Sequence, residues 1–280
     1  MANNVGSLPI IPATRGDDIH NIDHMHDADL VLFMAGNQFM VMEELMGEFR
    51  QDNPDIKRIF YETLPPGLEL KQILAGGALF GEKLIDVMPD IYTSVTEDAV
   101  NKLRERDLED RSFVYLHNRI VLMIPEGNPM GISAVNDLGR DDITISQPGE
   151  LEDISIYIHE MYKEAGGEAL LRRIMDEKRA EGTTILTVVH HRETPLRLVK
   201  GTADTGPVWA TEVINARNEG VKVEMLDPGE GLDQRDKVNY FITKLKGSGN
   251  PENADRFLDF ITSEKARNIY SSYGFVPHGQ

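Results

Sequence analysis

A short apolar run that passes through a tight turn into an amphipathic helix recurs along this chain, and this alternation constrains the fold most. The first copy has an apolar run at 29–34, a turn at 35–38 and apolar residues at helical spacing over 39–50. A second copy follows at 57–75, and a third begins at 91–94. Alternation at this spacing predicts an α/β fold with a mostly parallel sheet and helices on both faces.

The alternation is interrupted and then starts again, which divides the chain into two α/β lobes. Residues 113–124 form one apolar stretch that is longer than a typical strand. We therefore expect lobe 1 to comprise 29–117 and 239–280 and lobe 2 to comprise 118–238. Two hinge crossings would join the lobes and leave a ligand cleft between them. Residues 1–28, rich in Pro, Gly, Asn and Asp, are expected to form an N-terminal arm.

Composition excludes several classes of function. The 280 residues hold 29 Lys and Arg against 47 Asp and Glu, a formal net charge of -18. Because this charge repels phosphate backbones and anionic headgroups, nucleic acid and membrane surfaces are poor partners. The absence of Cys excludes disulfides, Cys-ligated metals and thiol catalysis. No apolar run approaches the ~20 residues of a membrane helix. No export signal is visible, so we expect either a chain whose signal has been removed or a cytoplasmic start.

The turns where a strand meets a helix are candidate ligand sites, because helix N-termini at the carboxyl edge of an α/β sheet attract anions. The first turn holds Asn37 and Gln38, of which Asn37 could equally serve only as the helix N-cap. The second turn holds Pro66 and Gly67. It offers shape and a backbone amide, since proline has no N–H.

The third turn is acidic. Glu152 and Asp153 crowd the expected start of a helix, where the helix dipole favours them. They could also pair with donors of a ligand or with a cation. The only tryptophan, Trp209, stands where a short strand meets a helix. We expect it either on the wall of the cleft or in the core.

The densest polar cluster of the chain lies at the fourth turn. Arg192 and Arg197 are fixed positive charges suited to a small anion. Glu193 or Thr194 is expected to cap a helix that starts at Pro195, a favoured first position. The alternative is a set of surface charges around a capped helix.

Two histidines and the missing motifs bear on metals and catalysis. His190 and His191 are adjacent and therefore point in different directions, which makes them a weak metal pair. The chain contains no GxSxG, HExxH, GxGxxG or P-loop motif. We therefore expect a binding protein without a cofactor, and not an enzyme.

Five segments of the chain, taken in order, carry a family resemblance. They are LVLFMAGNQFMVMEELMGEF (30–49), LELKQILAGG with PDIYTSVTEDAVNKL (68–103), NRIVLMIPEGNPMGISAVNDLGRDDITIS (118–146), ETPLRLVKGTADTGPVWATE (193–212) and FLDFITSEKARNIYSSYGF (257–275). Together they resemble the molybdate-binding branch of the type II extracytoplasmic, or periplasmic, solute-binding proteins of ABC transporters. The resemblance covers roughly residues 29–277.

The resemblance implies a two-lobed periplasmic-binding-protein fold that captures a small anion and delivers it to an ABC permease. Family members hold a tetrahedral oxyanion through hydroxyls and amides of four loops and one aromatic residue. By position these become Asn37 with Gln38, Pro66 with Gly67, Glu152 with Asp153, Glu193 with Thr194, and Trp209. Small hydroxyl residues are usual in the first two loops, and Tyr is usual in place of the tryptophan. The choice between molybdate, tungstate and another small anion therefore stays open.

Other functions of the same fold stay open as well. One is a sensor that binds a different small anion or a carboxylate and signals to a membrane partner. Another is a metal carrier that uses the two histidines together with Glu193 and Asp153. In each case we expect a monomer in the periplasm or outside the cell.

Overall fold

The computed structural model describes residues 8–279, with the exception of the side chains of His190 and His191. The beginning of the arm expected at 1–28, up to residue 7, lies outside the described residues. The same is true of both histidine side chains that were candidate metal ligands. Over the described part of the chain, no helix is long and apolar enough to cross a membrane.

The chain divides into two compact units. Unit 1 holds the chain up to Leu116 and again from Asn239, and unit 2 holds His117–Val238. The chain therefore passes from one unit to the other at two points. Each unit has its own sheets and its own buried apolar core.

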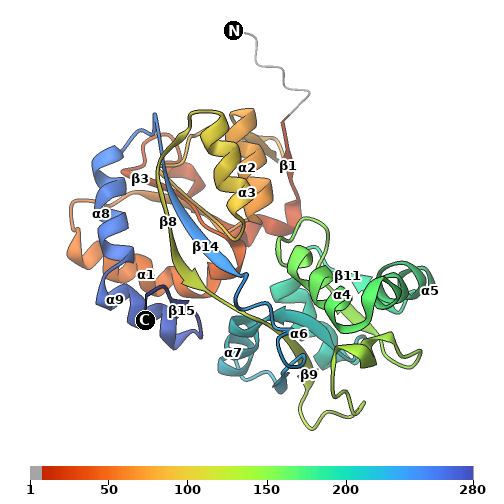
Figure 1. Cartoon of the computed structure of the whole chain (residues 1–280). Coiled ribbons are helices and arrows are strands. Elements are labelled where there is room, and N and C mark those ends of the chain that lie inside the picture. The colour runs from red at the N-terminus through yellow and green to blue at the C-terminus, as the bar shows by residue number, and fades with distance from the viewer. Residues whose placement is uncertain (1–7, 280) are drawn as a thin grey trace. The chain divides into compact units, whose positions relative to one another are not determined.

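Unit 1 is built on a seven-stranded sheet, counted over the described residues (Figure 1). In spatial order its strands are β15 (Val276–Pro277), β8 (Glu109–His117), β14 (Asn239–Leu245), β7 (Ile91–Ser94), β3 (Leu30–Phe33), β4 (Ile59–Glu62) and β2 (Ile19–His20). β3 pairs in parallel with β4 and β7, whereas β14 runs antiparallel to β7 and β2 antiparallel to β4. The expectation of a mostly parallel sheet is therefore wrong. The antiparallel strands come from the N-terminal segment and from the returning part of the chain, which no strand–helix repeat indicates.

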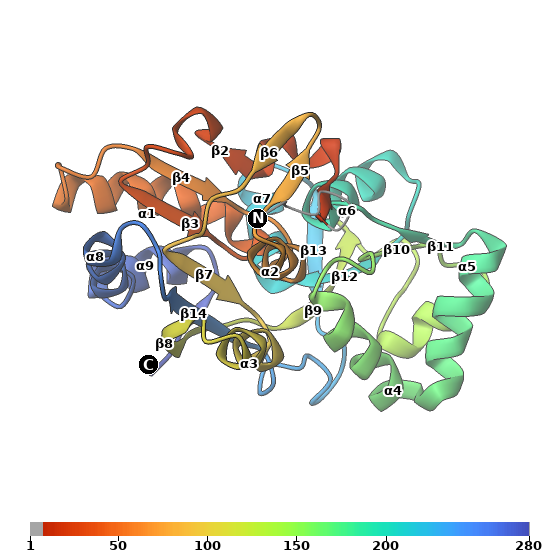
Figure 2. The ribbon, with the colours of Figure 1, turned by 90° about the horizontal axis from the view of Figure 1, so that it is seen from above.

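Helices cover both faces of this sheet, as expected (Figures 1 and 2). On one face lie α1 (Phe39–Asp52), α8 (Pro251–Ile261) and α9 (Glu264–Ser272), and on the other α2 (Pro66–Ala75) and α3 (Glu97–Glu105). Because both faces are covered, every residue of β3 is buried, with Val31 the most exposed at 5%. Val31 and Phe33 belong to the core cluster that includes residues of α2 and α3.

The described part of the N-terminal segment belongs to unit 1 and carries regular structure. Its elements are β1 (Ile10–Ile11), the 3-10 helices η2 (Ala13–Asp18) and η3 (Ile22–His24), and β2. β1 pairs with β5 (Ala78–Phe80), which forms a hairpin with β6 (Lys83–Ile85). This segment therefore adds one strand to each of two sheets of unit 1.

Unit 2 contains two small sheets. They are built from β9 (Ile120–Pro125), β10 (Ile145–Gln147), β11 (Thr184–Leu186), β12 (Gly206–Trp209) and β13 (Val223–Leu226). β9 lies between β12 and β13 and is antiparallel to both, and β10 pairs in parallel with β11. A parallel bridge between Ile145 and Thr205 joins the two sheets. The apolar stretch at 113–124, which is too long for one typical strand, consists of two strands in two sheets, because β8 ends at residue 117 and β9 begins at 120.

The helices of unit 2 are α4 (Ile154–Arg172), α5 (Lys178–Glu181), α6 (His190–Lys200) and α7 (Ala210–Asn218), with a 3-10 turn η5 (Val135–Gly139) and a π-helical turn η6 (Arg173–Glu177). The helix expected to start at Glu152 and Asp153 begins at Ile154, and Gly166 and Gly167 have non-helical backbone angles and kink it. α6 and α7 lie on one side of β9 and β12 (Figure 2). Val121 and Met123 of β9 pack into a core with residues of both helices.

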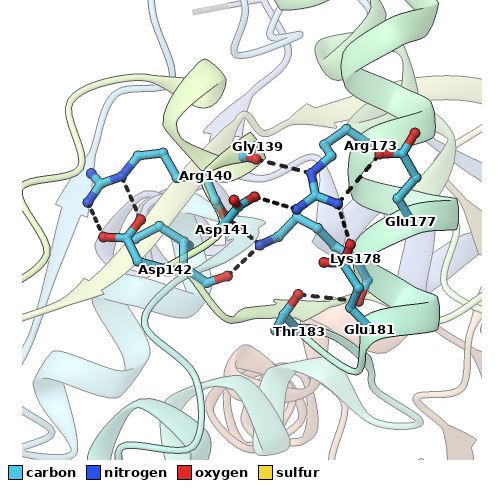
Figure 3. A network of polar contacts seen from close by, with 10 residues as sticks. Gly139, Arg140, Asp141, Asp142, Arg173, Glu177, Lys178, Glu181 and Thr183 are labelled. Atoms are coloured by element: carbon cyan, nitrogen blue, oxygen red, sulfur yellow. Dashed lines mark hydrogen bonds and ion pairs between the residues drawn. The ribbon is translucent and has the colours of Figure 1, made fainter.

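A network of hydrogen bonds and ion pairs connects α5 with the loop that follows η5 (Figure 3). At its centre Lys178 is fully buried, and its Nζ donates to the carbonyl oxygens of Arg140 at 2.6 Å and Ile143 at 2.7 Å. Around it, Arg173 pairs with the exposed carboxylates of Asp141 at 2.7 Å and Glu181 at 2.8 Å. Exposed pairs contribute little, whereas a buried ammonium satisfies carbonyl groups that water cannot reach. Lys178 is therefore the main stabilising member of this network.

Candidate functional site

The carboxyl ends of parallel strands bring two of the predicted loops together in unit 1. β3, β4 and β7 point the same way, so the loops that follow them lie at one edge of the sheet. A Cβ atom on Gly36, in the first loop, would lie 2.9 Å from the carbonyl oxygen of Thr63, in the second. The loop of Asn37 and Gln38 therefore touches the start of the loop of Pro66, as a shared site requires.

The side chains of Asn37 and Gln38 are both buried and point into unit 1. Asn37 Nδ2 donates to the hydroxyl of Tyr240. Gln38 Oε1 accepts from Tyr115 at 2.7 Å and Tyr270 at 2.8 Å. Asn37 is therefore not the N-cap of α1, whose N-cap position is Gln38. These side chains fix the turn, and the amides of Gln38 and of the first helical residue donate to carbonyl oxygens of the same turn.

The second loop leads into α2, which begins at Pro66, so both residues expected in the turn lie in the first turn of the helix. The carbonyl oxygen of Pro66 accepts from Tyr92 at 2.9 Å. Glu69, in the first turn, reaches back so that its Oε1 accepts from the amide of Leu64 at 3.1 Å. The carboxylate of Glu69 therefore already accepts the hydrogen bond of one backbone amide at the start of α2.

In unit 2, too, the loops that follow parallel strands lie at one edge of a sheet. β10 pairs in parallel with β11 and, through its bridge, with the chain that leads into β12. Gly149 and Thr187 approach so closely that a Cβ on the glycine would lie 2.2 Å from the carbonyl oxygen of Thr187. The amide Nε2 of Gln147 and the Oγ1 of Thr187 are buried without a hydrogen-bond partner. Neither residue is singled out by the patterns of the sequence, although Gln147 is the last residue of β10 and Thr187 directly follows β11.

The third loop places acidic groups beside two aromatic rings. Asp153 is the N-cap residue of α4, and Glu152 before it is buried. Burial, together with the charge of Asp153, raises the pKa of Tyr157 to about 12. The Tyr157 ring lies 6.0 Å from that of Trp209, which is 2% exposed and holds the N-cap position of α7. Trp209 therefore stands both in the core and at the strand end where a ligand residue is expected.

The fourth loop differs from the sequence-based expectation. α6 begins at residue 190, so Pro195 lies inside the helix and not at its first position. The expectation that Glu193 or Thr194 caps a helix starting at Pro195 is therefore wrong. Instead Glu193 reaches back from within α6, and its Oε1 accepts from the amides of Val188 and Val189, both at 2.7 Å. Thr194 is buried, with its Oγ1 2.9 Å from a serine hydroxyl of β10.

The two arginines of this loop have different surroundings. Arg197 Nη1 donates to the carbonyl of Ile185 at 2.9 Å, and its Nη2 donates to the carbonyl of Leu186 at 3.1 Å and to Glu193 at 2.7 Å. It thereby fastens α6 to β11 and is poorly placed to bind an anion. Arg192 lies half-buried on α6. Within the described residues, no group of three His, Cys, Asp or Glu side chains could hold a metal ion.

Replacing Gly149 by Ala should destabilise the chain by about 2 kcal/mol, because the new methyl group would overlap a backbone oxygen. The matched control is Gly47→Ala in α1, where no atom lies within 4 Å of the new Cβ. This control should gain up to about 1 kcal/mol from helix propensity. Urea unfolding of both variants measures the difference, and a Gly149→Ala chain as stable as the wild type would contradict the close approach of these loops.

The loops of unit 1 provide the starts of two helices at one edge of a sheet. The loops of unit 2 provide buried amide and hydroxyl groups beside aromatic rings. Oriented donors of this kind can hold a small polar solute.

Comparison with known proteins identifies relatives of this chain. The model of a family described as bacterial extracellular solute-binding protein matches residues 30–276. No curated protein matches the chain in sequence. Among solved structures, the periplasmic molybdate-binding protein of Azotobacter vinelandii has a TM-score of 0.68 at 17% identity, covering 88% of this chain and 98% of that one.

Two further solved structures have similar scores. The sulfate-binding protein SubI of Mycobacterium tuberculosis H37Rv has a TM-score of 0.70 at 14% identity, covering 89% of this chain and 86% of its own. Iron-bound HitA of Pseudomonas aeruginosa has a TM-score of 0.68 at 12% identity, covering 90% and 87%. At such low identities these likenesses concern the fold alone.

Proposed function

Because the chain belongs to the family of bacterial extracellular solute-binding proteins and has the mixed α/β, two-domain fold of their type II members, we propose that it captures a small oxyanion and delivers it to an ABC permease. The fold class expected from the sequence is thereby confirmed. The proposed solute is a molybdate-like tetrahedral anion. The proposed site includes the loops at the carboxyl ends of β10 and β11 in unit 2.

The observation that carries this proposal is the pair of polar groups buried at the edge of unit 2. Gln147 Nε2 and Thr187 Oγ1 lack hydrogen-bond partners, which is costly for buried groups unless a ligand supplies one. Both can donate, and the oxygens of an oxyanion accept. The family membership supports a binding function, and the donors support an anion as its ligand.

A second consideration concerns the charge of the site. Glu69 and Glu193 already accept hydrogen bonds from backbone amides at the starts of two helices. Their negative charge disfavours an external anion at these two positions. The anion is therefore expected to rely on side-chain donors such as those of Gln147 and Thr187.

A thermal-shift panel tests the proposal. Molybdate, tungstate, sulfate, phosphate, small carboxylates and ferric iron would each be added to the full chain after refolding without ligand. At 100 times its dissociation constant, one anion should stabilise the chain by about 2.7 kcal/mol, a rise of roughly 5 °C or more. Stabilisation by iron alone would favour the metal carrier, and no shift with any anion would refute the proposal.

A further inference from the structure

Unit 2 contains a cavity of about 400 Å³ that is lined by Glu164 of α4 and by residues of the loop that follows β13. None of the lining residues belongs to the four candidate loops. Most of the loop residues in the lining are exposed, so the cavity is open to water. A solute can therefore reach this cavity, and the proposed function does not use it.

Negative charge dominates the lining of the cavity. Its acidic residues are Glu164, Asp227, Glu230, Asp233 and Asp236. The two cationic side chains of the lining are already paired, Lys237 with Glu164 at 2.6 Å and Arg235 Nε with Asp233 at 2.7 Å. Asp227 lies 3.8 Å from an arginine outside the lining. Glu230 and Asp236 are exposed and form no ion pair with any described residue, so the cavity keeps an excess of negative charge.

A buried amide in the wall of the cavity has an acceptor without a donor. Gln234 lines the cavity and is only 3% exposed. Its Nε2 donates to Glu164 Oε2 at 2.5 Å and to the carbonyl oxygen of Leu232 at 3.3 Å. Its Oε1 is buried and has no hydrogen-bond partner among the described residues, which is unfavourable for a polar atom. A ligand that donates a hydrogen bond to this oxygen would remove that cost.

The charge of Glu164 fixes the orientation of this amide. Hydrogen bonds from Lys237 and Gln234 lower the pKa of Glu164, so its carboxylate is ionised at neutral pH. An ionised carboxylate only accepts hydrogen bonds, and the nitrogen end of the amide must therefore face it. The oxygen end is left for a donor. An oxyanion, which offers only acceptors, has no partner at this position.

We propose that this cavity binds a small organic cation whose ammonium group donates to Gln234 Oε1. An ammonium group combines N–H donors with a positive charge, and the site offers an unpartnered oxygen together with the exposed carboxylates of Glu230 and Asp236. A metal ion fits less well. Ca²⁺ takes about six to eight oxygen ligands, and no group of three acidic or histidine side chains in the described chain could hold a metal ion. The proposal does not depend on the oxyanion function.

The test is calorimetric titration of the full chain with 1,4-diaminobutane in low-salt buffer, because salt screens exposed charges. We expect saturable binding at one site per chain. The matched probe is the derivative of this diamine in which both nitrogens carry three methyl groups. This probe keeps both charges but has no N–H, and it should bind at least about tenfold more weakly. Calcium chloride is the third probe and should give no saturable heat.

Two variants locate the binding site. Gln234→Met keeps the shape of the side chain and removes the acceptor, whereas Glu230→Gln with Asp236→Asn removes the two exposed charges. Each should bind 1,4-diaminobutane at least about tenfold more weakly than the wild type. The matched control is Asp176→Asn with Glu219→Gln, which removes two exposed carboxylates elsewhere in unit 2 and should bind like the wild type.

Each outcome has a defined meaning. A wild-type chain that does not bind the diamine, or that binds the methylated probe equally well, would overturn the proposal. So would variants of the cavity that bind the diamine as tightly as the wild type. Saturable binding of calcium alone would indicate a metal site and would overturn it too. If Gln234→Met fails to fold, circular dichroism will reveal it, and the methylated probe and the exposed double variant decide the question.

Discussion

Replacing Glu62 by Gln should stabilise the chain by about 4 kcal/mol at pH 8 and leave its stability nearly unchanged at pH 4. Glu62 is fully buried at the end of β4, where Gln72 Nε2 lies 3.3 Å from its Oε1. Burial raises the pKa of its carboxyl from 4.5 to about 8. The folded chain therefore keeps a proton that the unfolded chain gives up.

The sign of the pH dependence follows from these two pKa values. Below about pH 4.5 the carboxyl is protonated in both states, and no difference arises. From there to about pH 8 only the folded state holds the proton, so the free energy of unfolding falls as the pH rises. Glutamine does not titrate, and the variant should lack this decline.

Urea unfolding at several pH values between 4 and 8, followed by far-UV circular dichroism, measures the effect. The control is Glu43→Gln, which removes an exposed carboxylate from α1 and should leave the pH profile as in the wild type. If the stability gap between Glu62→Gln and the wild type stays constant over this range, Glu62 is not protonated in the folded chain.

Replacing Lys178 by Ala should cost about 3–4 kcal/mol, the second large effect that we expect. The change leaves the carbonyl oxygens of Arg140 and Ile143 without their donor and opens a cavity beneath α5. Lys178→Met fills most of that space without an ammonium group and should cost about 2 kcal/mol. The difference between the two variants separates the cavity from the lost hydrogen bonds (Figure 3).

An exposed lysine of the same unit provides the control for these variants. Lys200→Met at the end of α6 should change the free energy of unfolding by no more than about 0.5 kcal/mol. If Lys178→Met were as stable as this control, the buried ammonium would contribute nothing to the network. All three variants can be compared by urea unfolding at pH 7.

The elements that the sequence predicts well are those whose pattern is local. β3 and β9 are continuous apolar runs, and each is buried on both faces as such runs require. The alternation of strands and helices correctly indicates an α/β protein. The direction of β14 is not predictable in this way, because it depends on where the chain returns to the sheet.

The candidate site is less predictable, since the partners of its side chains are distant in sequence. Gln38 is held by Tyr115 and Tyr270, and nothing near Gln38 indicates that its amide turns inward. The sequence places the start of α6 too late, because Pro195, a residue type that favours the first position of a helix, lies inside this one.

The net charge of -18 is compatible with an anionic solute. Surface charges act over a distance that salt limits to about 10 Å at 0.1 M. The donors of a binding site act at hydrogen-bond distance and are screened much less when buried. A soluble acidic surface and a local anion site can therefore coexist in one chain.

The most direct test of the proposed function is a calorimetric titration of the refolded, ligand-stripped wild-type chain with molybdate, tungstate, sulfate and phosphate. The account predicts saturable binding of at least one of these anions at one site per chain, in buffers of physiological salt. If none of them gives saturable heat, while the chain is folded by circular dichroism, the proposal of an oxyanion receptor is wrong.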